Sequence, residues 1–523
     1  MIYDASTFEL PIRVKADLCV VGSGAGGAAA AAAAAEAGLS VIVLESGPFV
    51  PPSIMNQREE DMMPELLVAN GSQRSADGRT TIIQGRALGG STVHNTNLCK
   101  RIPDPILAEW EATRGMKHLS RQRWNELYER VEAEQDIRYI EPERYNDHNQ
   151  LFKAGCEELG WESSGLMHNR TGCVESGFCS LGCAYDAKNN AAKVYVPRIV
   201  KAGSQLFTHC QAVRVLHRDG EATGVEAVAL DPQTRQPKGK VTIEASKVCL
   251  SASATGTPAI LLRSDIPDPS GRTGEGLTIH PALIAAGIFD EPLRAWQGIP
   301  QSYQCTEFLD FDAAHPPPDA GEAERARKDE VGNRTWLVPV FAHPMSTATL
   351  LPGWGAEHRR LMGRFDRLAA YTAMVHDVSE GRVRPSGDLG VDIEWSPSEA
   401  DRRELLFGLA RSAELMFASG ASKVYVPARP VIELEPGDSL APLEELDLES
   451  GDVDVTAVHP MSSVAMGDDP SAAVVDSRGK HHHLEGLWVA DGSLFPTSIG
   501  GPPQLSIYAL GIHVGEMISG TDS

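Results

Sequence analysis

Two short apolar runs stand close together near the start of the chain, at residues 17–21 and 41–44. Each has the length of a strand that is buried on both faces, so we predict two parallel strands. An almost unbroken series of alanines separates them. Because alanine has the highest helix propensity, this series predicts a helix from Ala28 to Ala37 that ends at Gly38. The pattern is typical of a strand–helix–strand unit.

The turn between the first strand and the helix is rich in glycine. Gly22 permits a tight turn, Gly24 lets the backbone approach a pyrophosphate, and Gly27, which follows Gly26, lets the helix pack closely on the strand. The helix N-terminus offers N–H groups and a positive dipole end to phosphates. Glu45, at the end of the second strand, can accept hydrogen bonds from ribose hydroxyls. These residues predict a dinucleotide site but do not separate FAD from NAD.

Length and charge narrow the class of protein. A chain of 523 residues is too long for one small core, so we expect at least two lobes. The net charge of −24 argues against nucleic acid and anionic membranes as partners. No run of about 20 uncharged apolar residues is present, so we expect no membrane-spanning segment. The N-terminus lacks the pattern of a signal peptide, which favours a cytoplasmic location, with periplasmic export alongside a partner subunit as the alternative.

Further glycine-, histidine- and proline-containing segments follow in a characteristic order. They are residues 85–97 (GRALGGSTVHNTN), 253–264 (SATGTPAILLRS), 275–281 (EGLTIHP), 459–461 (HPM) and 489–510 (VADGSLFPTSIGGPPQLSIYAL). Together they resemble the signatures of the glucose–methanol–choline (GMC) oxidoreductase family, and the resemblance extends over nearly the whole chain.

The resemblance implies an α/β fold in which the chain passes between two domains. We expect a Rossmann-like, discontinuous FAD-binding domain and an α+β substrate-binding domain that includes the cysteine-containing segment. The FAD-binding domain is expected over residues 1–100, 190–290 and 455–523, and the other domain over 101–189 and 291–454.

Several residues in these segments are suited to contact FAD. Three glycines allow the close backbone approach that a flat flavin ring needs. A serine and an asparagine can hydrogen-bond its polar edge. An aspartate and a glycine after the apolar run at 487–490 can meet the ribityl and pyrophosphate portion. A proline is also expected near the flavin ring. Together, the candidate cofactor-binding residues in these segments are Gly85, Gly89, Gly90, Ser91, Asn95, Asp491, Gly492 and Pro502.

Oxidation of an alcohol requires a base for the hydroxyl proton and a hydride acceptor, which is the flavin N5. His459 matches the principal histidine of the family, and a neutral imidazole suits the role of base. The family usually places Asn or His at a second position beside N5. Here that position is Pro502, which has no side-chain hydrogen bond to offer. His280, His376 and Gln504 are the candidates to replace it.

Three cysteines occur close together in a glycine-rich segment, at Cys173, Cys179 and Cys183. Their spacing resembles that of bacterial membrane-linked sugar dehydrogenases of the same family, in which three cysteines hold a [3Fe–4S] cluster. Such a cluster would pass electrons to an external protein, for example a cytochrome or a small partner subunit. Two alternatives are a zinc site with His168 as fourth ligand, and cysteines that are free or paired in disulfides.

Two further histidine positions require interpretation. His94 lies in the segment at 85–97, where some sugar dehydrogenases of the family carry a histidine bonded covalently to FAD. Here it either makes that bond or packs against the ring. The three histidines at 481–483 lie in a hydrophilic stretch, so we predict a solvated turn rather than a metal site.

The sequence therefore predicts an FAD-dependent dehydrogenase that oxidises a CH–OH group of an alcohol or sugar and passes the electrons to an external carrier. An oxygen-using alcohol oxidase is the alternative within the same class. A hydroxynitrile-lyase-like flavoprotein without net redox chemistry and a protein that binds FAD only for structure are alternatives from other classes.

Overall fold

The first sheet is built on the two apolar runs near the start of the chain. β3 (Leu18–Val21) and β4 (Val41–Leu44) pair in parallel with Leu18 beside Val41, and all their residues are buried. Complete burial is usual for parallel strands that are covered on both faces. The strand order is β1-β10-β4-β3-β14-β25, completed by β1 (Ile2–Asp4), β10 (Gln205–Thr208), β14 (Lys247–Leu250) and β25 (Leu487–Val489).

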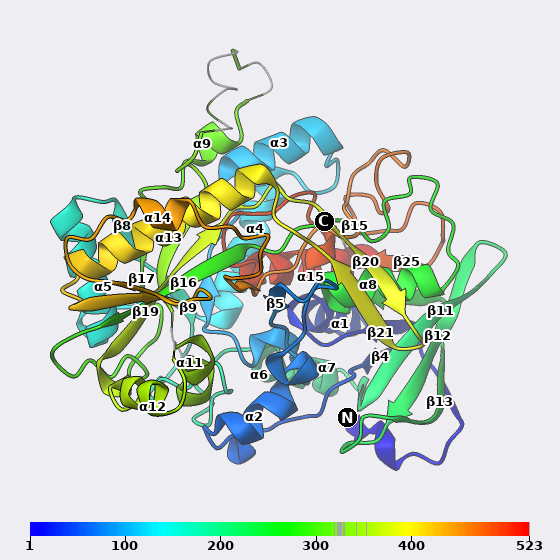
Figure 1. The fold of residues 1–523 in the computed structure, drawn as a ribbon. Helices are drawn as coiled ribbons and strands as arrows, with labels where there is room; N and C mark the ends of the chain where they lie inside the picture. Colours follow the sequence, from blue (N-terminus) through cyan, green and yellow to red (C-terminus); the bar gives the residue numbers. More distant parts are fainter. Residues whose placement is uncertain (318–319, 322–326, 328–329, 341–342, 352, 522–523) are drawn as a thin grey trace.

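The computed structural model describes residues 1–317, 320–321, 327, 330–340, 343–351 and 353–521. Figure 1 shows the first sheet and its helices on one side of the molecule and a second sheet on the other. The strand order of the first sheet confirms the predicted α/β, Rossmann-like core.

Helices α1 (Ala25–Glu36) and α15 (Gln504–Ser519) pack against each other beside the first sheet (Figure 1). Every residue of α1 except its last is alanine or glycine. On α15, Gly511 and Gly515 are one turn apart and therefore lie on one face. A Cβ atom at these positions would lie 2.4 Å from Gly26 O and 2.7 Å from Ala30 O, respectively. Small residues on both helices are therefore required for this close packing.

The first turn of α1 also contacts the ends of two other strands. A Cβ atom on Gly26 would lie 1.7 Å from Ala490 O, and one on Gly22 would lie 2.1 Å from Ser251 O. Gly22 also has a φ of +97°, which favours glycine. The predicted helix started at Ala28, three residues late, because the low helix propensity of glycine hides a first turn whose packing requires it.

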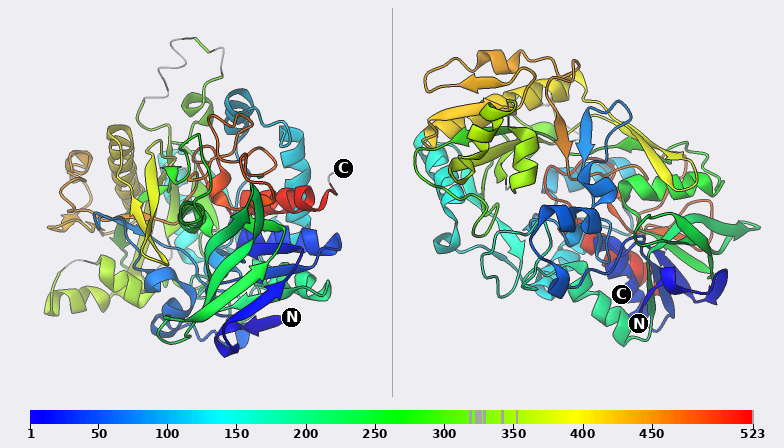
Figure 2. Two further views of the ribbon diagram at one scale, coloured as in Figure 1. Left: turned by 90° about the vertical axis from the view of Figure 1, so that its right-hand side faces the viewer. Right: turned by 60° about the horizontal axis from the view of Figure 1, so that its bottom comes forward.

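A smaller sheet lies beside the first one. Its antiparallel strands β11 (Cys210–Arg218), β12 (Glu221–Leu230) and β13 (Pro237–Glu244) are followed by β2 (Ile12–Lys15), which pairs in parallel with β13. Figure 2 shows this N-terminal segment in blue beside the green strands.

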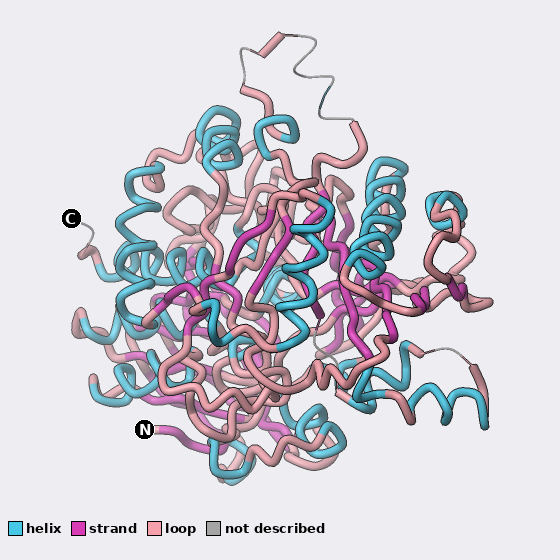
Figure 3. The backbone as a smooth tube through the Cα atoms, turned by 90° about the vertical axis from the view of Figure 1, so that its left-hand side faces the viewer, coloured by secondary structure: helices cyan, strands magenta, loops and turns pink. Residues whose placement is uncertain are grey.

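The second large sheet has the strand order β23-β22-β16-β19-β18-β17-β8. Helix α13 (Glu399–Ala418) contacts β16, β18 and β19 and covers one face of the sheet. Figure 3 shows strands in the interior and helices around them. The strands are β8 (Ser163–Gly165), β16 (Pro281–Ile288), β17 (Tyr303–Cys305), β18 (Thr335–Val340), β19 (Leu368–Val375), β22 (Lys423–Val426) and β23 (Ile432–Leu434).

The boundary expected for the FAD-binding domain at residue 290 does not agree with the observed strand pairing, because strands before this residue belong to the second sheet. β16 lies in the second sheet, and so do β5 (Thr80–Ile82) and β24 (Val455–Ala457), which lie within or at the edge of segments expected in the FAD-binding domain. The chain therefore passes between the sheets close to residues 280 and 459. The division of the chain into two domains as a whole stays a prediction.

The remaining elements surround these sheets. The helices are α2 (Glu59–Leu66), α3 (Asp104–Arg114), α4 (Arg121–Gln135), α5 (Asp147–Leu159), α6 (Ala191–Val194), α7 (Val196–Lys201), α8 (Ser253–Arg263), α9 (Phe311–Ala314), α11 (Pro344–Leu350), α12 (Ala356–Met362) and α14 (Ala441–Glu444). The strands are β6 (Leu98–Cys99), β7 (Ile137–Tyr139), β9 (Met167–Asn169), β15 (Glu275–Leu277), β20 (Gly381–Ser386) and β21 (Gly390–Glu394).

Replacement of Gly26 by alanine is expected to destabilise the cofactor-free protein by about 1–3 kcal/mol or more, because the new methyl group overlaps Ala490 O. Gly24→Ala is the matched control. Gly24 has an ordinary φ of −66°, and the nearest atom to a methyl group at this position is 4.0 Å away. Thermal unfolding at a fixed scan rate should show a lower midpoint for Gly26→Ala only, and equal midpoints would contradict the packing argument.

Candidate active site

Glu45 links the glycine-rich turn to the loop that follows β4. Its buried carboxylate accepts hydrogen bonds from the Ser23 N–H (3.2 Å), the Ser23 hydroxyl (2.5 Å) and the Gly47 N–H (2.8 Å). Burial raises the pKa of Glu45, and these hydrogen bonds act in the opposite direction. Ser23 Oγ in turn accepts from the Gly89 N–H at 3.0 Å. Glu45 therefore holds the turn, and through Ser23 it also holds the loop at 85–97.

The loop at 85–97 lies directly over the glycine-rich turn. Gly89 and Gly90 have φ values of +103° and +56°, and a Cβ atom on Gly90 would lie 2.8 Å from Gly24 Cα. The Gly85 N–H donates to Ser91 Oγ at 2.9 Å, so Ser91 closes the loop on itself. The glycine-rich turn and the loop at 85–97, which are far apart in the sequence, thus meet at the N-terminus of α1.

Asp491 follows β25 at the same edge of the first sheet. Its carboxylate accepts from the Thr257 hydroxyl (2.5 Å) and the Ser493 N–H (2.9 Å), and burial raises its pKa. Gly492 comes next, and a Cβ atom there would meet the Ile507 side chain at 3.2 Å. The carboxyl ends of β3, β14 and β25 are therefore adjacent, as at the ligand-binding edge of other parallel sheets.

These residues fit a dinucleotide such as FAD. The N-terminus of α1 has no side-chain hydrogen bond at its cap, so its first N–H groups are available to a pyrophosphate. His94 Nε2 is buried and has no hydrogen-bond partner among the described residues. Burial, with Lys188 adding to it, lowers the pKa of His94 to about 3, so the ring is neutral.

His459 and His280 lie side by side where the chain passes between the two large sheets. Their Nδ1 atoms are 3.1 Å apart, so one ring can donate to the other. Burial lowers the pKa of His459 to about 3. Burial also lowers the pKa of His280 well below its ordinary value, with His459 and Lys100 contributing. Both rings are therefore neutral at physiological pH, the state in which an imidazole can accept a proton.

Asp377 fixes the backbone of His280. Its carboxylate accepts from the N–H groups of Ile279 (2.8 Å) and His280 (3.2 Å). His280 has a φ of +54°, a conformation that costs energy in any residue other than glycine, and these bonds help to hold it there. Burial raises the pKa of Asp377 to about 7, with Asp401 adding to the shift. No motif marked Asp377 in the sequence, although it directly follows the candidate His376.

Lys100 was also missed by the sequence reasoning. It lies beside the loop of Pro502, since a Cβ atom on Gly501 would be 3.4 Å from the Lys100 side chain. Its amine donates to Gln304 Oε1 at 3.1 Å and lies 4.9 Å from the centroid of the Trp336 ring. Burial lowers the pKa of Lys100 to about 8. A lone lysine after a strand carries no sequence signal, and only folding brings it to this position.

The three candidates to replace the usual second residue lie in different surroundings. His280 is in contact with His459. The ring of His376 lies 6.5 Å from that of His280 between centroids. Gln504 is occupied elsewhere, because its side chain accepts from Asn95 Nδ2 (2.8 Å) and donates to Leu98 O (2.7 Å). His280 is therefore the candidate closest to the predicted base.

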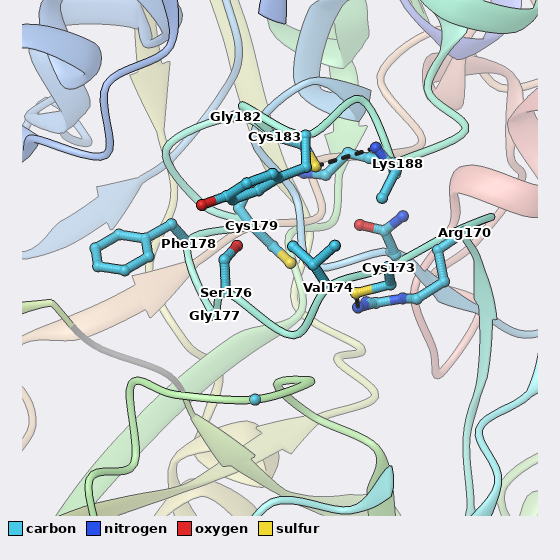
Figure 4. A pocket seen from close by; sticks show the side chains of 14 residues that line it. Arg170, Cys173, Val174, Ser176, Gly177, Phe178, Cys179, Gly182, Cys183 and Lys188 are labelled. Atoms are coloured by element: carbon cyan, nitrogen blue, oxygen red, sulfur yellow. Dashed lines mark hydrogen bonds between the residues drawn. The ribbon is translucent and has the colours of Figure 1, made fainter.

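Cys173, Cys179 and Cys183 line one pocket, with Arg170 beside Cys173 (Figure 4). Across the described residues, no group of three or more His, Cys, Asp or Glu side chains is arranged to hold a metal ion. The geometry therefore does not fit the predicted cluster or the zinc alternative. In the structure all three are free cysteines.

Lys188 connects the cysteine segment to the loop at 85–97. Its buried amine donates to Val93 O (2.9 Å), to Asn95 O and to Cys179 O (2.7 Å). Burial lowers its pKa to about 8. The cysteine segment thus packs directly against the loop expected to contact the flavin.

The prediction of a solvated turn at 481–483 is wrong for its first residue. His481 is buried, and burial lowers its pKa to about 4. The His482 ring hydrogen-bonds Gly467 O at 2.9 Å. The hydrophilic sequence did not indicate burial because a contact such as that of His482 with Gly467 forms only in the folded chain.

The pKa of Asp377 leads to a prediction about stability. The folded state binds the proton of the Asp377 carboxyl more tightly than the unfolded chain does. Protonated Asp377 therefore stabilises the fold fully below about pH 4, and this stabilisation is lost as the pH rises through about 7. In the unmutated protein, the free energy of unfolding should therefore fall by on the order of 2–4 kcal/mol between pH 4 and 8 because of Asp377. In Asp377→Asn this fall should be absent. Thermal midpoints of both proteins across this range measure the difference. An identical pH profile for both would contradict the shifted pKa.

Family models match three parts of the chain: GMC oxidoreductase over residues 63–282 and again over 377–511, and an NAD(P)-binding Rossmann-like domain over 20–71. An uncharacterised GMC-type oxidoreductase from Mycobacterium tuberculosis is 32% identical over 519 residues, which cover 97% of this chain and 76% of the relative. A long-chain-alcohol oxidase from Arabidopsis thaliana is 26% identical over 97% of this chain and 67% of its own length.

The fold agrees with that of a solved structure. Pyridoxine 4-oxidase from Mesorbium loti matches with a TM-score of 0.68 at 18% identity, over 96% of this chain and 98% of that one. Within the described part of the chain, no helix is long and apolar enough to cross a membrane. From the family models and the mycobacterial relative together, the chain belongs to the GMC oxidoreductase family.

Proposed function

We propose that this protein uses FAD to oxidise a CH–OH group to a carbonyl. When bound, FAD supplies the hydride acceptor. The observation that carries the proposal is the neutral, hydrogen-bonded pair of His459 and His280 at the junction of the two large sheets. The turn at 22–27, the loop at 85–97 and Asp491 would hold the cofactor, with Glu45 positioning the first two.

His459 would take the hydroxyl proton. Its pKa of about 3 keeps the ring unprotonated before the substrate arrives. His280 contacts His459 through Nδ1, and its other ring nitrogen, Nε2, is buried and has no hydrogen-bond partner in the described residues. We infer that His280 replaces the missing side chain at Pro502 by holding the His459 ring, through Nδ1, in position for the alcohol oxygen.

A mostly apolar strip on the second sheet, which Leu98 and Leu166 partly cover, supports a long alkyl chain as part of the substrate. Residues in alternate positions share one face of a sheet, here the face opposite α13. Three cross-strand rows follow each other along it: Trp336–Met374–Ala282, Val338–Thr372–Ile284 and Val340–Ala370–Ala286. The first row lies under Lys100, beside the loop of Pro502.

The far end of the strip forms part of the lining of an apolar pocket. Ala286 and Ala370 line it together with Trp296, Leu351 and Phe365. Ala286 lies five residues beyond Pro281, about 17 Å along the strand from the region of the histidine pair. That distance suits a long-chain alcohol with its hydroxyl at His459 and its tail in the pocket, and the Arabidopsis relative is named a long-chain-alcohol oxidase.

The name of that relative also supports oxygen as electron acceptor. A protein carrier is the second candidate, and the contact between the cysteine segment and the flavin loop through Lys188 favours it. Reoxidation of the reduced protein by air, compared with reoxidation by an artificial one-electron acceptor, separates the two.

Anaerobic mixing with primary alcohols of two to sixteen carbons tests the proposed function. The flavin absorbance should bleach, and the apparent affinity should rise with chain length by about 0.8 kcal/mol for each buried methylene. His459→Ala should slow bleaching by roughly 10²–10⁴-fold. A lyase or a structural flavoprotein would keep its colour with every alcohol in the series.

Ala370→Phe, which fills the pocket, provides the control for the tail-binding site. It should weaken binding of the longest alcohols and leave the shortest ones unaffected, because only a long chain reaches Ala370. Equal weakening for short and long alcohols would place the substrate chain elsewhere.

We further propose that FAD is bonded covalently to His94. The neutral ring and the unpartnered, buried Nε2 support this bond. After acid precipitation the yellow colour should stay in the protein pellet, and His94→Ala should move it to the supernatant. Release of flavin from the unmutated protein by acid would show that His94 only packs against the ring.

A further inference from the structure

A row of imidazoles leads from the predicted base to the protein surface. Beyond His459 and His280 lies His376, whose Nε2 is 2.5 Å from His315 Nε2. His315 Nδ1 pairs with the carboxylate of Glu109 on α3. The side chain of His315 is 7% exposed and that of Glu109 is 31% exposed, so the row ends at water.

We propose that His280, His376, His315 and Glu109 conduct the proton that His459 takes from the alcohol to the solvent. The inference rests on the proposed function. Oxidation of CH–OH to C=O removes a hydride, which FAD accepts, and one proton, which His459 accepts. For each alcohol oxidised, one proton leaves His459 along the row and one leaves Glu109 to water, so no charge accumulates in the buried site.

The contacts of His315 use both of its ring nitrogens, as proton conduction requires, and His280 keeps Nε2 for the next step. His459 and His280 meet through Nδ1, which leaves the buried Nε2 of His280 for the next step. His376 and His315 meet through Nε2, and His315 then uses Nδ1 toward Glu109. Since each contact joins two imidazoles or an imidazole and a carboxylate, one partner can donate while the other accepts.

The step between His280 and His376 requires one bridging water molecule. The two rings lie 6.5 Å apart between centroids with an interplanar angle of 82°, too far for a direct hydrogen bond. A single water molecule can bridge polar groups at such a separation. The proposal therefore includes one water at this point.

The protein holds both of these rings in place through their backbones. Asp377 accepts from the His280 N–H, and Arg334 donates from Nη1 to His376 O at 2.9 Å. Arg334 itself pairs with the buried Asp401 at 2.5 Å. These buried charges fix the backbone at both histidines without engaging the imidazole nitrogens that carry the proton.

The packing around His376 is equally specific. Its ring lies 5.7 Å from that of Phe311 between centroids. Gly500 passes beside both rings, since a Cβ atom there would lie 2.2 Å from Phe311 Cε1 and 3.4 Å from His376 Cγ. Burial is the main cause that lowers the pKa of His280, and His459 and the nearby cation Lys100 add to the shift. The charge of Lys100 favours movement of a positive charge away from the site.

Anaerobic stopped-flow mixing in weak buffer with a pH indicator tests the proposal on the FAD-loaded enzyme. Flavin bleaching and proton release are recorded in the same mixing experiment, with an alcohol that bleaches the flavin of the unmutated protein. The ratio of the proton-release rate to the bleaching rate should fall at least about tenfold in His315→Gln and Glu109→Gln. Glu109→Asp should keep the ratio, and imidazole in solution should restore it in His315→Ala.

Glu111→Gln is the matched control, because Glu111 lies on the same helix and pairs with Arg121 at the surface. It should leave the ratio unchanged. Proton release that keeps pace with bleaching in both His315→Gln and Glu109→Gln would overturn the proposal, because the proton would then leave His459 by another route. Should His315→Gln fail to fold, the surface variant Glu109→Gln decides alone. Absence of bleaching by any alcohol would instead contradict the proposed function.

Discussion

The close approach of backbones around the first turn of α1 is the constraint on which the rest of the structure depends. Gly26 meets Ala490 O on one side and Gly511 on the other, while Gly22 meets Ser251 O. No side chain larger than hydrogen fits these contacts. They bring three strand ends and two helices to one point, and this point is where the N–H groups at the start of α1 are left available to phosphates.

Much of the first sheet could be predicted from sequence because its signals are local. The runs that became β3 and β4, the glycine-rich turn and the alanine-rich helix each follow from a few neighbouring residues. The candidate site could be predicted only in part. His315 and Glu109 carry no motif, and they come to His376 only through the packing of α9 and α3. Spacing alone also could not tell that three neighbouring cysteines on one loop would fail to form a ligand set.

Buried ionisable groups, rather than apolar contacts, position the loops of the site. Glu45 holds the glycine-rich turn, Asp377 holds the histidine backbone, and Lys188 holds the loop at 85–97 against the cysteine segment. Each makes several hydrogen bonds to backbone groups or short side chains, which offsets the cost of burying its polar head. Such contacts are directional, so they fix loop positions more narrowly than apolar packing could.

The helix pair α1 and α15 has a consequence for how the protein is made. β25 and α15 follow β14 and α1 only after most of the chain has been synthesised, yet they pack directly against them. Until β25 and α15 have been synthesised, β14 lacks one of its two neighbouring strands and the face of α1 that packs against α15 is uncovered. Domains normally fold as units during synthesis, but the core around α1 cannot be completed before α15 has been made. Binding of a nucleotide at the start of α1 therefore has to follow the synthesis of α15.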